Sequence, residues 1–336
     1  MDNLLNTTLK MWRTVAGGGT AIEGFLNQRY TSARSSIERK YKGENFICCW
    51  SKARRDRQIG IYVRGSCDLV SILFCQPLIH QALQGRCCII RDGLVSDSRS
   101  DILLQSLEDF PPEWLDPVIT RLKLPADYFQ PRFFEKSFAI QGSRGREEFA
   151  KTVIFMSIAP DVARTVYRHR QHGFLVDPGE WWLKQSTAKV LGDLSTVTWF
   201  WENFVSIGKL SVAAFAENLS KIITTLKQNT EAHVLVFNTL TNDADHPNHP
   251  EKAAADSPMV RRRTFNARLQ ELSRQLDFAI VDVDLVLKRA GLGMKGSAVN
   301  FPPEREEPSV HGAFQVIARE AFRMMSDLGV FERRFR

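Results

Sequence analysis

Residues 64–68, Arg-Gly-Ser-Cys-Asp, contain the side chains best suited to nucleophilic chemistry. They follow a β-rich apolar run at 59–63 and precede a second apolar run, which indicates a strand, a tight turn and a helix. Gly65 permits the tight turn, and the amides and dipole at the start of the helix stabilise an anion on the next two residues. A thiolate at Cys67 or an activated hydroxyl at Ser66 therefore has a physical reason to be nucleophilic.

A nucleophile of this kind needs a base, and the candidate is His311. It follows the proline- and glutamate-rich stretch 301–309 and lies immediately before the last predicted helix, where a late loop can return over the strand ends. Glu306 and Glu307 are near enough in sequence to orient the imidazole ring, and the sequence does not choose between them. Both candidates also have a structural interpretation, His311 as a helix cap and Cys67 as a small residue in a turn.

Short apolar runs separated by helical patterns indicate the elements that position these residues. The predicted strands are 59–63, 86–90, 173–177, 233–238 and 278–283. The predicted helices are 69–74, 211–228, 262–276 and 312–328. Strands that are apolar throughout and alternate with helices favour a parallel sheet covered on both faces. We therefore expect an α/β fold, a three-layer α/β/α sandwich with a parallel five-stranded sheet.

One α/β domain is expected over residues 58–330, preceded by a polar N-terminal extension at 1–57. Residues 94–170, in which prolines alternate with aromatic residues, are predicted to be an insertion or lid with a short helical pattern at 149–156. Its aromatic residues either line a substrate cleft or anchor loops in the core. They are Trp114, Tyr128, Phe129, Phe133 and Phe134.

In such sheets the polar residues just beyond the carboxyl ends of the strands converge on the ligand crevice. They are Ser66, Cys67 and Asp68 after the first strand, Asp177 after the third, Asn238 after the fourth, and Asp282 and Asp284 after the fifth. Asp282 either faces this crevice or serves as a helix cap or solvent-exposed group.

The order of these features resembles the SGNH (GDSL-like) hydrolase superfamily over about residues 59–328. The resemblance rests on Gly-Ser-Cys after the first strand, on the later strand–helix–strand segment, on a strand that ends in Asp282, and on a His before the terminal helix. The strand–helix–strand segment carries Phe215-x-x-Asn218-Leu219 and leads to Val234-Leu235-Val236. The chain is most similar to the branch with Gly-Ser-Cys where most members have Gly-Asp-Ser.

The resemblance implies a flavodoxin-like strand topology and acyl transfer. Cys67 would replace the nucleophilic serine, with Ser66 as the alternative if the turn is offset by one residue. His311 would be the general base, and backbone amides around Gly65 to Asp68 would form part of an oxyanion hole.

The chain departs from the family at two places. Pro308 stands where the family has an Asp three residues before the His, so the third triad member is missing or moves to Glu306 or Glu307. Residues 176–180, Val-Asp-Pro-Gly-Glu, replace the Gly-x-Asn-Asp block, so Asn238 is only the positional candidate for the oxyanion Asn. The predicted oxyanion and substrate-binding residues are Gly65, Asp68, Asp177 and Asn238.

Two functions fit this set of residues. The first is an acyl-ester hydrolase or O-acyltransferase acting on an acylated saccharide or a small biosynthetic intermediate. The alternative is a catalytically degenerate SGNH-fold protein that binds a carbohydrate or a protein partner. No cofactor and no metal are expected, because the Asp- and His-containing loop 242–249 includes Pro247, is followed by Pro250 and has no second ligand cluster beside it.

The 336-residue chain has 45 Lys and Arg against 38 Asp and Glu, a formal net charge of +7. The excess lies in short clusters at 54–57, 261–263 and 333–336. We interpret these clusters as solvated faces, so nucleic acid is not an expected partner.

Six cysteines, including the vicinal pairs 48–49 and 87–88, form neither a disulfide framework nor a Cys-x-x-Cys motif, which favours a reducing cytoplasm. Residues 1–26 lack the continuous apolar region of a signal peptide, and no run of about 18 apolar residues occurs. We therefore expect a cytoplasmic protein without a membrane span, and the sequence leaves its oligomeric state open.

Overall fold

The computed structural model describes fifteen stretches of the chain. They are residues 37–42, 46–51, 58–65, 69, 86–91, 99–122, 124, 128–129, 134, 140–142, 145–147, 151–177, 194–241, 258–290 and 308–330. In 37–60, 86–91, 140–147 and 308–315 only the backbone of these residues is described. Within the described part of the chain, no helix combines the length and the apolar composition that crossing a membrane requires.

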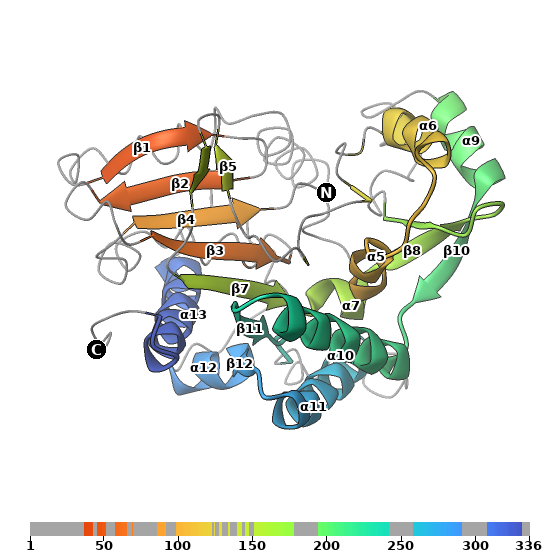
Figure 1. Cartoon of the computed structure of the whole chain (residues 1–336). Coiled ribbons are helices and arrows are strands. Elements are labelled where there is room, and N and C mark those ends of the chain that lie inside the picture. Colours follow the sequence, from red (N-terminus) through yellow and green to blue (C-terminus); the bar gives the residue numbers. More distant parts are fainter. Residues whose placement is uncertain are drawn as a thin grey trace.

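A seven-stranded sheet forms the centre of the molecule, with the order β1-β2-β4-β3-β7-β11-β12 (Figure 1). The strands are β1 (Ile37–Lys42), β2 (Phe46–Ser51), β3 (Gln58–Arg64), β4 (Arg86–Arg91), β7 (Lys151–Ser157), β11 (His233–Phe237) and β12 (Ala279–Val281). The pairings from β4 through β3, β7 and β11 to β12 are all parallel. β2 joins β4 and β1 joins β2 in antiparallel fashion, so the sheet is mixed.

Helices cover both faces of this sheet, and β7 shows why they must. Its side chains alternate, so that Val153 and Phe155 enter one apolar cluster while Ile154 and Met156 enter another. The first cluster is completed by α12 (Val283–Arg289) and α13 (Pro308–Asp327). The second is completed chiefly by α10 (Val212–Asn229) and α11 (Pro258–Leu276). A strand that is buried on both sides can carry apolar residues at every position.

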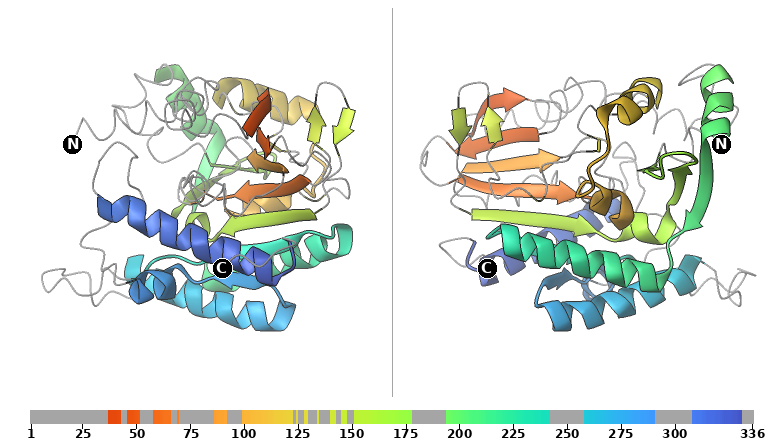
Figure 2. Two further views of the ribbon diagram at one scale, coloured as in Figure 1. Left: turned by 90° about the vertical axis from the view of Figure 1, so that its left-hand side faces the viewer. Right: turned by 45° about the vertical axis from the view of Figure 1, so that its right-hand side comes forward.

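A second lobe has a core of its own, rich in aromatic side chains. It contains the three-stranded sheet β10-β8-β9, formed by β8 (Thr165–His169), β9 (Leu175–Val176) and β10 (Phe204–Lys209). The helices α5 (Ser100–Gln105), α6 (Pro112–Leu122) and α9 (Leu194–Asn203) pack with it. Figures 1 and 2 show this lobe on the side toward which β3, β4 and β7 point.

The short segment around α5 reaches both outer strands of the three-stranded sheet. Arg99 Nη1 donates to the carbonyl oxygen of Gly208 on β10 at 2.6 Å. The Gln105 side chain donates to the carbonyl of Leu175 on β9 and accepts from its amide, each at 2.7 Å. Two polar side chains from one segment thus fix the position of this sheet.

The predicted α/β fold, with a parallel sheet and covering helices, is confirmed, although the sheet also has the antiparallel strands β1 and β2. The predicted number of five strands is wrong, because β1 and β2 extend the sheet. These two strands lie within 1–57, which was predicted to be an extension, and they pair with the sheet because β4 offers them an open edge.

The predicted third strand of the sheet is also wrong. Residues 173–177 contain β9, which belongs to the sheet of the second lobe. The third parallel strand of the central sheet along the chain, after β3 and β4, is β7. The helical pattern predicted at 149–156 is a strand, because an apolar run buried on both faces does not alternate and resembles a helical segment. The range 94–170, predicted to be an insertion, therefore includes a strand of the central sheet.

The double burial of β7 predicts a large difference between two valine substitutions. Val153→Ala, at a side chain with no exposed area, should lower the free energy of unfolding by about 2 to 3 kcal/mol. Val205→Ala on β10, where 41% of the residue is exposed, is the matched control and should cost no more than about 0.5 kcal/mol. Urea denaturation measures both, and equal losses would contradict the central position of β7.

Candidate functional site

The carboxyl ends of β3 and β7 meet at the point where the strand order reverses. The chain passes from β3 to β4 on one side and later returns to β7 on the other side of β3. Leu69, after β3, packs in the first apolar cluster, whereas α10, after β7, packs in the second. In doubly wound sheets, ligands bind at the point where the strand order reverses.

Gly65 occupies this switch point. Arg64 pairs with Met156, so Gly65 lies level with Ser157 at the end of β7. A Cβ atom on Gly65 would lie 2.8 Å from the Cβ of Ser157 and 2.6 Å from Cδ1 of Leu69. The backbone at Gly65 can therefore approach β7 this closely only because residue 65 has no side chain.

The residues predicted to carry the chemistry lie mostly outside the described part of the chain. This is the case for Ser66, Cys67, Asp68, Glu306 and Glu307, and also for the loop 242–249. His311 was expected just before the last helix, but α13 begins at Pro308 and includes His311 in its first turn. The side chain of His311 lies outside the described residues, so its role as a base stays a prediction.

Asn238, the candidate oxyanion donor, links the ends of β11 and β12. Its Nδ2 donates to Oδ1 of Asp282 at 2.9 Å, and its Oδ1 accepts from the amide of Val283 at 2.7 Å. Oδ1 of Asp282 also accepts from the amide of Leu285 at 3.1 Å, which caps α12. These contacts show a structural role for both residues, and an oxyanion role for Asn238 stays a prediction.

Asp284 also makes structural contacts. Its Oδ1 accepts from the amide of Thr241 at 2.7 Å, and its Oδ2 accepts from the hydroxyl of the same residue. It therefore holds the segment that follows β11 against the start of α12.

Asp177 lies in the second lobe, because the strand before it is β9. Its Oδ2 lies 3.1 Å from Nε of Arg164, and its amide donates to the hydroxyl of Tyr128 at 2.9 Å. The structure thus does not bring Asp177 to the end of a central strand, and a role in binding substrate stays a prediction.

Three of the aromatic residues predicted either to line a cleft or to anchor loops are buried: Tyr128, Phe129 and Phe134. Trp114 on α6 is 37% exposed and stacks on His172, with ring centroids 4.3 Å apart. The buried three act as loop anchors, whereas Phe133 lies outside the described residues.

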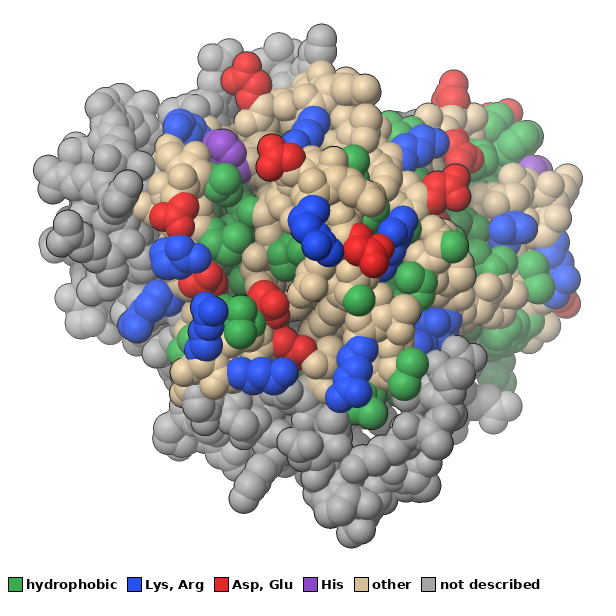
Figure 3. Space-filling view, turned by 90° about the horizontal axis from the view of Figure 1, so that it is seen from below, with side chains coloured by type: hydrophobic (Ala, Val, Ile, Leu, Met, Phe, Trp, Pro, Cys, Tyr) green, Lys and Arg blue, Asp and Glu red, His purple; other side chains and the backbone are tan. Residues whose placement is uncertain are grey.

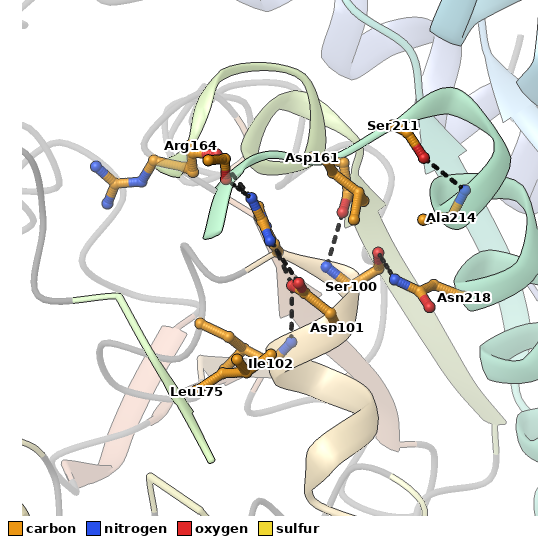
Figure 4. A network of polar contacts seen from close by, with 12 residues as sticks. Ser100, Asp101, Ile102, Asp161, Arg164, Leu175, Ser211, Ala214 and Asn218 are labelled. Carbon is orange, nitrogen blue, oxygen red and sulfur yellow. Dashed lines mark hydrogen bonds and ion pairs between the residues drawn. The ribbon is translucent and has the colours of Figure 1, made fainter. Parts of the chain in front are cut away.

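A buried polar network that the sequence analysis missed lies close to the end of β7 (Figure 4). Asp161, on the short helix α7 (Ala159–Ala163), accepts from the amide of Ser100 through Oδ1 at 2.8 Å. Asn218 of α10 donates to Oγ of Ser100 at 3.1 Å. Burial raises the pKa of Asp161 from its ordinary value of 3.8 to about 7, although hydrogen bonds from Ser100 oppose the shift. A carboxyl group of this kind exchanges its proton near neutral pH.

Arg99 is the largest polar side chain of this network and is 1% exposed. It binds the carboxylate of Asp101 through Nε at 3.1 Å and Nη2 at 2.5 Å. Its Nη1 donates to the carbonyl oxygens of Arg164 and Gly208. The buried guanidinium group thus has both a counter-charge and backbone acceptors, as a buried charge requires.

One local signal would have led to Asp161. The run Thr152-Val153-Ile154-Phe155 is β-branched and aromatic, which is typical of a buried strand. If it is assigned as a strand, Ser157 and Asp161 follow its carboxyl end. Ser100 and Asn218 carry no comparable signal, because each lies far from Asp161 in the sequence.

The basic run 261–263 is not simply a solvated face. Arg261 donates to the carbonyl oxygens of Val162 and Leu210 and lies over the ring of Phe265 at 5.1 Å. Figure 3 shows one face of the molecule, on which Lys and Arg side chains lie among Asp and Glu side chains. Ion pairs such as Arg268 with Glu271 show that some of the basic side chains have a carboxylate partner nearby.

Metal-binding groups are not found in the described portion of the chain, where no three His, Cys, Asp or Glu side chains gather in a way that could hold an ion.

No protein-family model matches the sequence, and no curated protein matches it. Among solved structures the chain is similar to Axe2, an acetylxylan esterase from Geobacillus stearothermophilus, with a TM-score of 0.37 and 10% identity over 83% of this chain and 96% of that chain. It is also similar to LAE5, an α/β hydrolase enzyme from the metagenome of Lake Arreo, Spain, with a TM-score of 0.36 and 9% identity over 83% of this chain and 98% of that chain. The topology of the central sheet is defined by its strand order and by the register of its strand pairs.

The contact at the switch point predicts a compensating pair of substitutions. Gly65→Ala should lower the free energy of unfolding by about 1 to 3 kcal/mol, because its new methyl group overlaps Ser157. Adding Ser157→Gly removes the facing Cβ and should recover part of that loss, with a coupling of about 1 kcal/mol in a double-mutant cycle. Urea denaturation of the four proteins measures this coupling, and strictly additive losses would contradict the close approach.

Proposed function

We propose that the protein is an SGNH-type acyl-ester hydrolase or O-acyltransferase whose nucleophile is Cys67 or Ser66. The substrate would be an acylated saccharide or a small biosynthetic intermediate. The observation that carries the proposal is the position of Gly65 at the switch point of the parallel sheet, directly before the two candidate nucleophiles. Ligands of doubly wound sheets bind at this position.

In the proposed mechanism, Cys67 or Ser66 attacks the carbonyl carbon of the ester while His311 accepts the proton of the nucleophile. Backbone amides of residues 65–68 would stabilise the oxyanion that forms on the carbonyl oxygen. His311 then gives its proton to the leaving alcohol. Water or a sugar hydroxyl attacks the acyl-enzyme next, and His311 again serves as the base.

The close approach of Gly65 to Ser157 supports this mechanism in a specific way. The backbone at Gly65 lies close to the end of β7, where Ser157 is itself buried, and this leaves little room for residue 65 to shift. A fixed backbone keeps amide donors aligned before the reaction starts, which is how oxyanion holes stabilise the transition state.

Three alanine substitutions test the proposal on a panel of acetylated sugars and short acyl esters. The variant that removes the nucleophile, Cys67→Ala or Ser66→Ala, should lower kcat/KM by at least about 10³-fold, and His311→Ala should do the same. Cys75→Ala is the control, because its thiol has no place in the mechanism, and it should retain wild-type kcat/KM.

Covalent probes identify the nucleophile independently. A chloroacetamide adduct that disappears in Cys67→Ala indicates the thiol, whereas a fluorophosphonate adduct that disappears in Ser66→Ala indicates the hydroxyl. Unchanged turnover in all three alanine variants would overturn the mechanism. Binding of a glycan without turnover by the wild-type protein would instead favour the degenerate carbohydrate-binding alternative.

A further inference from the structure

Residues 158–164, the β7–β8 connection, join the central sheet to the second lobe and are held by both. The amide of Ile158 donates to the carbonyl of Phe237 on β11 at 3.2 Å. The carbonyl of Val162 accepts from Arg261 Nε of α11 at 3.2 Å. The carbonyl of Arg164 accepts from Arg99 Nη1, also at 3.2 Å. The position of this connection thus depends on how the two bodies, the central sheet with its helices and the second lobe, pack together.

Asp161 lies within this connection and is buried, with 5% of its surface exposed. Its Oδ1 accepts from the amide of Ser100, at the start of α5 in the second lobe, at 2.8 Å. Oγ of Ser100 in turn accepts from Asn218 of α10, a helix that covers the central sheet. A chain of hydrogen bonds from Asn218 through Ser100 to Asp161 therefore crosses the contact between the two bodies (Figure 4).

The charged groups around Asp161 do not neutralise it. Arg99 forms its ion pair with Asp101. The negative charge of Asp101 opposes ionisation of Asp161, and the positive charge of Arg99 favours it to a smaller extent. Arg261 donates to backbone carbonyls, and Arg164 lies against Asp177. Within the described residues, no cation forms an ion pair with Asp161. Burying the ionised carboxylate in this position costs free energy, because the charge loses its hydration and gains no ion pair. Burying the protonated carboxyl group costs much less.

We propose that Asp161 is a proton-binding positioning residue: its neutral carboxyl group allows the β7–β8 connection to pack closely, and its ionised form loosens that packing. The effect on the site rests on the proposed function, because the connection begins beside Ser157, which contacts the Gly65 turn. The carboxyl group releases its proton to solvent when the connection opens and binds one again when it closes.

The direction of the pH effect follows from linkage. The pKa of Asp161 is about 7 in the closed state, because of burial, and close to 3.8 where water reaches the carboxylate. Between these values the closed state binds more protons than the open state, so opening becomes easier as the pH rises. The opening equilibrium should grow by up to about tenfold per pH unit from about pH 4 to pH 7, then level off.

Hydrogen exchange on the full chain, read by mass spectrometry in peptides covering 99–105 and 158–164 from pH 5 to pH 9, tests the proposal. After correction for the intrinsic exchange rate, wild-type opening should increase up to pH 7 and then remain constant. Asp161→Asn keeps the shape and the acceptor for Ser100 but does not titrate, so its opening should be independent of pH. Asp116→Asn, which removes an exposed carboxylate on α6, is the matched control and should behave as wild type.

A second variant tests the same point if Asp161→Asn does not fold. Ser100→Ala removes a hydroxyl that stabilises the ionised form, so the pH at which opening levels off should move upward. A pH dependence that persists in Asp161→Asn, or that is absent from the wild type, would overturn the proposal. An unchanged midpoint in Ser100→Ala would overturn it as well.

Activity separates this proposal from the proposed function. If the protein hydrolyses esters, the kcat/KM of the wild type divided by that of Asp161→Asn should fall from pH 5 to pH 7. A ratio that stays constant would contradict the positioning role. If neither the wild type nor any variant hydrolyses an ester, the proposed function is overturned, but the proposal about Asp161 is not. The exchange data then still decide whether Asp161 couples proton binding to the packing of the two bodies.

Discussion

Burial of β7 on both faces is the constraint on which the rest of the structure depends. A strand in this position is apolar from Val153 to Met156, so its buried middle presents no polar side chain. The polar chemistry at its carboxyl end therefore begins at Ser157, the last residue of the strand, and continues in the residues that follow. Ser157 meets the Gly65 turn there, and Asp161 meets Ser100 four residues later. The candidate site and the contact with the second lobe thus begin at the same strand end.

The second lobe lies beyond the carboxyl ends of the central strands, so the segment after β7 has to serve both bodies. It does so with a helix of only five residues, whose carbonyl groups have few partners within the helix. Arg99 and Arg261 supply the missing donors from opposite sides of the contact. Buried backbone acceptors are rarely left without a hydrogen bond, and here two guanidinium groups meet that requirement.

Local patterns in the sequence predicted the strands β3, β4, β11 and β12 and the helices α10, α11 and α13. β7 was missed because its apolar run was given a helical pattern, and periodicity alone does not separate a strand buried on both faces from a buried helix. β9 was assigned to the wrong sheet because strand pairing depends on partners that are distant in the sequence. Gly65 could be predicted from its turn, whereas the contact of Asp161 with Ser100 joins residues 61 positions apart and has no local signal.

The side chains that reach the two outer strands of the small sheet have a consequence for how molecules of this protein meet one another. Outer strands present backbone amides and carbonyls with which a strand of a second molecule can pair. Gln105 occupies both groups of Leu175, and Arg99 occupies the carbonyl of Gly208. One short segment of the same chain thus takes up hydrogen-bonding groups through which two copies could otherwise join strand to strand. A strand of a second molecule would have to displace these side chains before it could pair at Leu175 or Gly208.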